Sequence, residues 1–129
     1  MTGRARHFKI PRYMFAFASC VLMALICWSS TRPTPHPVMI DRNVMDHVWD
    51  FAHFPVYTML TILLLLSFES MAFHFQVIAF VLASACGVFN ELIQLHVPGR
   101  SYSVKDMLVN AFGALVAILI CRNSKYFKS

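Results

Sequence analysis

The segment Asn90–Gly113 has the sequence NELIQLHVPGRSYSVKDMLVNAFG and lies between two long apolar runs. It is unusually polar for that position, because it contains the side chains of Glu91, Gln94, Arg100, Asp106 and Asn110. Polar and ionisable groups at membrane depth are costly and commonly mark a functional site. The sequence therefore predicts an integral membrane protein with one polar site in this segment.

The composition supports a membrane protein. Of the 129 residues, 58% are hydrophobic and only 13% are charged, whereas soluble domains are roughly 25% charged. The length allows one compact domain. The net charge is +5, and most basic residues lie near the two ends of the chain: Arg4, Arg6, Lys9, Arg12, Arg122, Lys125 and Lys128. Such clusters beside apolar runs are typical of topology signals that face anionic lipid, so we expect no nucleic-acid partner.

Four apolar runs predict an all-α fold, with about four transmembrane helices in one small bundle. Each run is close to the roughly 20 residues that a helix needs to cross the hydrocarbon core. The remaining residues, 1–12 and 122–129, are expected to be basic cytoplasmic tails, and residues 13–121 a single membrane domain. The predicted spans are Tyr13–Ser30, Phe51–Phe68, Met71–Leu95 and Val104–Cys121.

The basic start followed by an apolar run also fits a cleavable signal peptide, although we favour an uncleaved first span because three more spans follow. In the long loop that comes next, Asp41 is expected to cap a short helix from Arg42 that leads into the second span. Pro55 is expected to kink that span and expose a carbonyl near His53. Glu69 and Ser70 predict a very tight turn.

The distribution of Lys and Arg predicts the orientation. With four spans, the basic clusters at both ends of the chain lie on one side of the membrane, and the positive-inside rule places both termini in the cytoplasm of a bacterial inner membrane. Trp28 and Trp49 then lie at the outer boundary, where amphipathic rings are favoured. The polar residues of the second, third and fourth spans all fall at the outer leaflet.

Helical spacing groups these polar residues. Asp50, His53 and Tyr57 are separated by three and four residues, so they share one helix face, and Glu91 and Gln94 share another. The Pro98-Gly99 pair is expected to form a turn that directs Arg100 back toward the helix ends. In the fourth span the same spacing links Asp106, Asn110 and Gly113, with Ala117 one turn further. The small residues Gly113 and Ala117 are expected to permit close approach of another helix.

The candidate catalytic residues are His53, Glu91 and Asp106. His53 would be a general acid or base, with Glu91 or Asp106 as its orienting carboxylate and Arg100 as a clamp for an anion. Structural alternatives remain open, because Glu91 and Arg100 also fit a buried ion pair, and Asp106 fits a helix cap. The expected ligand-binding residues are Asp50, Tyr57, Gln94, Arg100 and Asn110.

We expect no cofactor and no metal ion. The acids and His53 could be imagined as metal ligands, but the sequence lacks a HExxH motif and a second clustered histidine. It also lacks a phosphate-binding glycine-rich loop and a GxSxG motif.

The chain resembles the VanZ-like family of small bacterial integral membrane proteins. The resemblance covers about half of the chain, from Asp50 to Gly113. It departs from the family pattern at Asn90, where many members have a second acid, and at Phe51, where a lysine is common. The matching residues are Asp50, His53-Phe54, Tyr57, Glu91, Gln94, Pro98-Gly99-Arg100, Ser103, Asp106, Asn110 and Gly113.

The resemblance implies a multi-span helical fold, and the family is named after a member associated with glycopeptide (teicoplanin) resistance. The expected partner is a membrane lipid or a lipid-linked envelope precursor, which the polar site would bind or modify. The alternative is a non-catalytic structural protein whose polar cluster binds a membrane-protein partner, and a homo-oligomer is also left open. A transporter is disfavoured, because a transport path should have ionisable groups at mid-depth.

Overall fold

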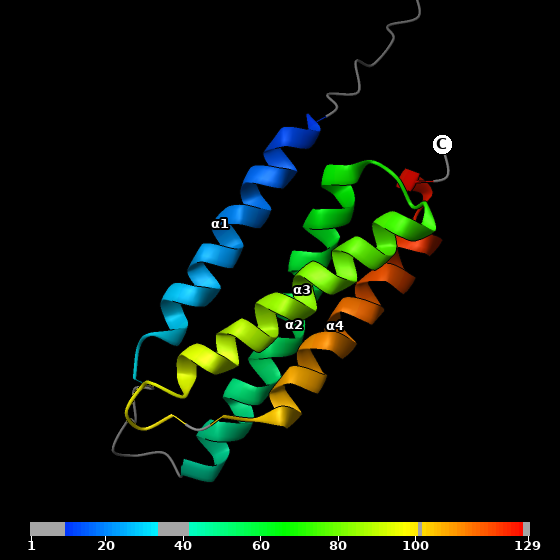
Figure 1. The fold of residues 1–129 in the computed structure, drawn as a ribbon. Helices are drawn as coiled ribbons and strands as arrows, with labels where there is room; N and C mark the ends of the chain where they lie inside the picture. The colour runs from blue at the N-terminus through cyan, green and yellow to red at the C-terminus, as the bar shows by residue number, and fades with distance from the viewer. Residues whose placement is uncertain (1–9, 34–41, 101, 128–129) are drawn as a thin grey trace, which may run out of the picture.

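The computed structural model describes residues 10–33, 42–100 and 102–127; within these ranges the side chains of residues 42–50 and of Tyr126 are not described. All secondary-structure elements in this part of the chain are helices, and it contains no strand, as predicted (Figure 1). Its elements are α1 (Arg12–Ser30), α2 (Arg42–Phe68), α3 (Phe73–Gln94), α4 (Val104–Asn123) and the short 3-10 helix η1 (Lys125–Phe127).

Each of the four α-helices is long and apolar enough to cross a membrane, which confirms the prediction of four spans. Within α2, the described stretch Phe51–Phe68, which is the range expected for the second span, is long and apolar enough to cross a membrane. The start of α1 and the end of α4 lie together at what we call the terminal end of the bundle (Figure 1). The end of α1 and the start of α4 lie at the opposite end, which we call the loop end.

The helix α2 is continuous for 27 residues. The short helix expected from Arg42 is therefore the beginning of α2 rather than a separate element, and Asp41 lies outside the described residues. Pro55 lies inside α2 without ending it. The tight turn expected at Glu69 is present, because α2 ends at Phe68 and Glu69 adopts a φ of 51°.

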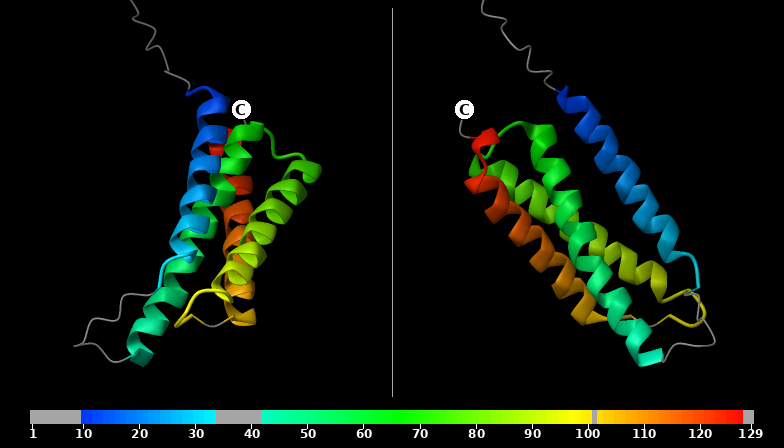
Figure 2. Two further views of the ribbon diagram at one scale, coloured as in Figure 1. Left: turned by 60° about the vertical axis from the view of Figure 1, so that its left-hand side comes forward. Right: turned by 180° about the vertical axis from the view of Figure 1, so that it is seen from behind.

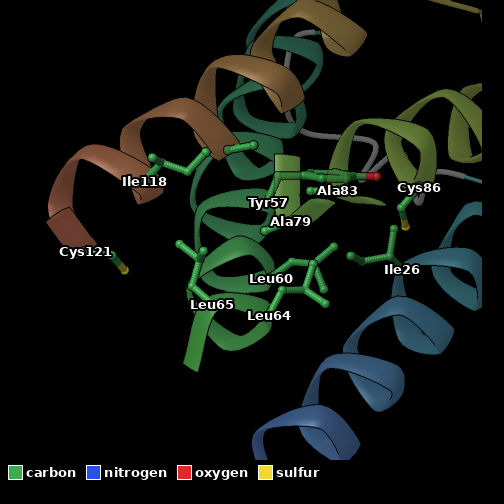
Figure 3. Packing of buried hydrophobic residues seen from close by; sticks show 11 residues of the cluster. Ile26, Tyr57, Leu60, Leu64, Leu65, Ala79, Ala83, Cys86, Ile118 and Cys121 are labelled. Carbon is green, nitrogen blue, oxygen red and sulfur yellow. The ribbon is translucent and has the colours of Figure 1, made fainter. Parts of the chain in front are cut away.

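The four helices do not pack equally. α2 packs most extensively on α4, whereas α1 packs on α2 and α3 and makes no helix contact with α4 within the described residues. Seen from behind, α1 lies at one edge of the bundle and α4 at the other (Figure 2). The buried side chains between them form one core around Tyr57 (Figure 3). They include Ile26, Leu60, Leu64, Leu65, Ala79, Ala83, Cys86, Ala114, Ile118 and Cys121.

Close contact between α2 and α4 depends on Gly113. A Cβ atom at this position would lie 2.8 Å from the backbone oxygen of Phe54, so no larger residue fits without movement. The hydroxyl of Thr58 bridges the two helices, since it lies 3.1 Å from the Gly113 carbonyl oxygen. One turn further along α4, Ala117 is fully buried. The predicted role of Gly113 in close helix approach is confirmed, and that of Ala117 stays a prediction.

Candidate functional site

Polar side chains from α2, α3 and α4 gather at the loop end of the bundle. Glu91, Asn90 and Asn110 are 0%, 1% and 1% exposed. Gln94 and Asp106 are also buried. Because burying polar groups is costly unless they find partners, the contacts of each side chain show how this cluster is held.

The histidine expected to act as an acid or base is paired with an amide. Nδ1 of His53, on α2, lies 3.2 Å from Oδ1 of Asn110, on α4. With the amide oxygen accepting, Nδ1 carries the proton, and in a neutral imidazole the lone pair then lies on Nε2. The described hydrogen-bond partner of Nδ1 is therefore the amide of Asn110, one helical turn beyond Asp106 on α4. That Glu91 or Asp106 acts as an orienting carboxylate stays a prediction.

On its other side Asn110 packs closely against Gly87 of α3. A Cβ atom at Gly87 would lie 3.0 Å from Nδ2 of Asn110, so the absence of a side chain there makes room for the amide. The same histidine stacks on Tyr57 one turn along α2, with ring centroids 6.3 Å apart and an interplanar angle of 15°. Tyr57 is buried, and its hydroxyl points toward Cys86 (Figure 3).

Glu91 connects α3 to the start of α4. Its Oε2 accepts a hydrogen bond from the backbone N–H of Ser103 at 3.0 Å, and Ser103 is the N-cap of α4. The Ser103 hydroxyl in turn accepts from the backbone N–H of Asp106 at 3.2 Å. The first N–H groups of a helix lack intrahelical acceptors and carry a partial positive charge, so a carboxylate is favourable there. Glu91 therefore stabilises the conformation of the α3–α4 loop.

The Glu91 carboxylate also interacts electrostatically with His53, Asp106 and Arg100. The structure therefore brings together at one place the three residues predicted to be catalytic, although their chemical roles stay a prediction. In the part of the chain that the structure describes, no group of three His, Cys, Asp or Glu side chains is arranged to hold a metal ion.

Arg100 lies in the α3–α4 loop, directly after Gly99, whose φ of 84° confirms the expected turn. Its side chain is half-buried, and its Nε lacks a hydrogen-bond partner among the described residues. Burial lowers the pKa of the guanidinium, and the negative charge of Glu91 partly offsets that effect. No hydrogen bond joins Arg100 to Glu91 in the described structure, so the two charges attract each other without forming the buried ion pair that we had kept as an alternative.

A pocket of about 110 Å³ lies beside these residues. His53 and Tyr57 of α2, Gln94 of α3 and Arg100 line it together with the last turn of α1. Its full lining is Ile26, Ser29, Ser30, Ala52, His53, Val56, Tyr57, Asn90, Gln94 and Arg100. The lining includes both apolar and polar side chains.

The contribution of α1 was missed in the sequence. The Ser30 hydroxyl donates a hydrogen bond to Oδ1 of Asn90 on α3, and both residues are buried. The available signal was the position of Ser29 and Ser30 at the loop end of the first span, at the same depth as Asn90. Among the other predicted site residues, Gln94 lines the pocket, whereas the side chain of Asp50 lies outside the described residues.

Comparison with known proteins identifies the family. A family model described as VanZ/LLP1 matches residues 15–126. This chain belongs to the VanZ/LLP1 family. No curated protein and no solved structure matches the chain. The VanZ/LLP1 match extends beyond the segment Asp50–Gly113 to include most of α1, the helix that completes the pocket wall.

Proposed function

We propose that this VanZ/LLP1 protein binds the anionic head group of a membrane lipid or of a lipid-linked envelope precursor. The environment of Arg100 is the observation that supports this proposal. A half-buried guanidinium that lines a pocket and has an unpartnered Nε can donate hydrogen bonds to a phosphate or carboxylate, and its planar fork matches either group.

The position of the pocket favours a lipid over a soluble anion. It lies at the loop end of a membrane-spanning bundle, where head groups are found, and Ile26 and Val56 are apolar residues in its lining. Its volume of about 110 Å³ is enough for a small anionic group but not for a whole lipid, so the acyl chains would remain in the bilayer.

We further propose that the loop end faces the outside of a bacterial inner membrane and that both termini are cytoplasmic. The excess of Lys and Arg near both ends of the chain supports this orientation. The ligand would then come from the outer leaflet, where envelope precursors are used. This location would be compatible with a link to glycopeptide (teicoplanin) resistance, with which the member that gave the family its name is associated.

Modification of the bound lipid is a second candidate function. The bond from His53 to Asn110 leaves Nε2 free to accept a proton in a side chain that lines the pocket. A base oriented by a third group is the arrangement that general acid–base catalysis requires. Without turnover, the same cluster would serve binding alone, or the docking of a partner membrane protein.

The two functions can be tested with purified protein in lipid nanodiscs and a radiolabelled extract of bacterial envelope lipids. Bound lipid is measured by native mass spectrometry, and products by thin-layer chromatography. We expect Arg100→Gln to weaken retention of anionic lipid by roughly tenfold or more, because charge-assisted hydrogen bonds are lost. If the protein is an enzyme, His53→Gln should abolish turnover while leaving binding nearly unchanged.

Arg32→Gln is the matched control. Arg32 is exposed, lies just after α1 at the loop end, and has its guanidinium 4.8 Å from the ring centroid of Trp28, outside the pocket. Equal retention by the wild type and by Arg100→Gln would overturn the binding proposal. Binding without any product would indicate a non-catalytic protein.

A further inference from the structure

A second pocket lies at the terminal end of the bundle, far from the polar site. It has a volume of about 360 Å³ and separates the first turns of α1 from the end of α2 and the start of α3. Arg12, Tyr13 and Ala16 form one wall, and Ser67, Phe68 and Phe75 form the other. The start of α1 and the end of α2 lie at the same end of the molecule (Figure 2).

The two walls differ in character. On the far wall, Phe68 and Phe75 stack with ring centroids 5.0 Å apart and form a mostly apolar surface. On the α1 wall, Tyr13 is 70% exposed and Ala16 leaves an open surface. A groove of this kind on a membrane-spanning bundle opens to the hydrocarbon of the bilayer, so an acyl chain is the apolar group that can fill it.

The mouth of the groove is basic. Arg12 is exposed at the first residue of α1, and its guanidinium makes no ion pair or hydrogen bond with a described residue. Arg122 and Lys125 add positive charge at the same end. Among the described residues at that end, Glu69 carries the opposing negative charge. Basic pockets between transmembrane helices bind the head groups of anionic lipids.

We propose that this groove binds an anionic phospholipid of the leaflet that surrounds the terminal end, with the phosphate at Arg12 and an acyl chain between Tyr13–Ala16 and the Phe68–Phe75 stack. The site is separate from the pocket beside Arg100, and it belongs to the other leaflet. By filling the groove, the lipid would hold the start of α1 against α2 and α3.

A tryptophan in the groove provides a local test. Phe75→Trp is introduced in a background with Trp28→Phe and Trp49→Phe, and the protein is reconstituted in vesicles that contain brominated lipid. Quenching by brominated phosphatidylglycerol is compared with quenching by brominated phosphatidylcholine. We expect phosphatidylglycerol to be preferred roughly fivefold, the effect of one Arg near a charged membrane surface. Arg12→Gln should remove this preference, and Ala16→Phe should lower quenching by both lipids.

Arg122→Gln and Arg100→Gln are the controls, because neither residue lines the groove. Both should keep the preference, and the Arg100 variant separates this site from the proposed head-group pocket. Equal quenching by the two lipids, or a preference that survives Arg12→Gln, would overturn the proposal. If Arg122→Gln lost the preference to a similar extent, the preference would come from a general attraction of anionic lipid to the basic surface and not from the groove. If Phe75→Trp does not fold, Phe68→Trp on the same wall gives the same readout.

Discussion

Nδ1 of His53 lies 3.2 Å from Oδ1 of Asn110, and this contact joins α2 to α4 at the level of the polar site. Asn110 is 1% exposed and packs against Gly87 of α3, so one amide side chain of α4 contacts both α2 and α3. The histidine therefore has a neutral amide as the partner of Nδ1, and this contact adds no charge beside the ring.

We expect Asn110→Ala to destabilise the protein by about 1–3 kcal/mol, because the buried His53 contact loses its acceptor. The free energy of unfolding can be measured by SDS titration in mixed micelles. Asn123→Ala is the matched control, since Asn123 is an exposed amide on the same helix whose Nδ2 donates to the Leu119 carbonyl oxygen at 3.1 Å. Equal effects of the two substitutions would mean that the His53 contact does not stabilise the fold.

Gly113→Ala should destabilise the bundle by about 1–3 kcal/mol, because the new methyl group meets the backbone oxygen of Phe54, which cannot move by itself. Gly87→Ala should be milder, because the atoms it meets belong to the Asn110 side chain. The same unfolding assay ranks the two variants. A Gly113→Ala protein as stable as the wild type would show that α2 and α4 do not approach as closely as described.

Substitutions of Glu91 and of Arg100 should affect the protein level independently of each other. Glu91→Leu leaves the Ser103 N–H without its acceptor and should cost about 1–3 kcal/mol, whereas Glu91→Gln retains an acceptor oxygen and should be milder. Arg100→Gln should accumulate normally, because the guanidinium is half-buried and not hydrogen-bonded to Glu91.

Steady-state protein level in membranes is the measurement for this set. Combining Glu91→Leu with Arg100→Gln should give a level no higher than that of Glu91→Leu alone. Recovery in the double variant would instead indicate that the two charges stabilise each other as a buried pair.

The proposed orientation predicts that the α3–α4 loop is outside the cell membrane. Tyr102→Cys, introduced in a background without the four native cysteines, should react with an impermeant thiol reagent in intact cells whose outer membrane, if present, is permeabilised. Tyr102 is exposed, so the reagent has access to it. Labelling that requires lysis of the cells would place this loop in the cytoplasm and reverse the orientation.

Much of the fold could be predicted from local pattern. A segment in lipid must satisfy its backbone polar groups internally, so each apolar run of sufficient length forms a helix whatever its neighbours are. The spans, the turn at Glu69 and the close approach at Gly113 followed from this rule and from residue size. The concentration of polar residues in Asn90–Gly113 likewise predicted the place of the site.

The partners of those polar residues were decided only by the tertiary structure. Helical spacing shows which side chains share a face, but it does not set the rotation of one helix against another. That rotation pairs Nδ1 of His53 with Asn110, and it brings Ser30 of α1 to Asn90. Glu91 found its partner in the Ser103 backbone N–H, a group that every residue but proline carries and that no sequence pattern distinguishes. The sequence by itself determined the helices and the location of the polar cluster, because these depend on hydrophobicity along the chain. The hydrogen bonds within the cluster depend on how closely four helices pack and at which rotation, and these are properties of the assembled bundle.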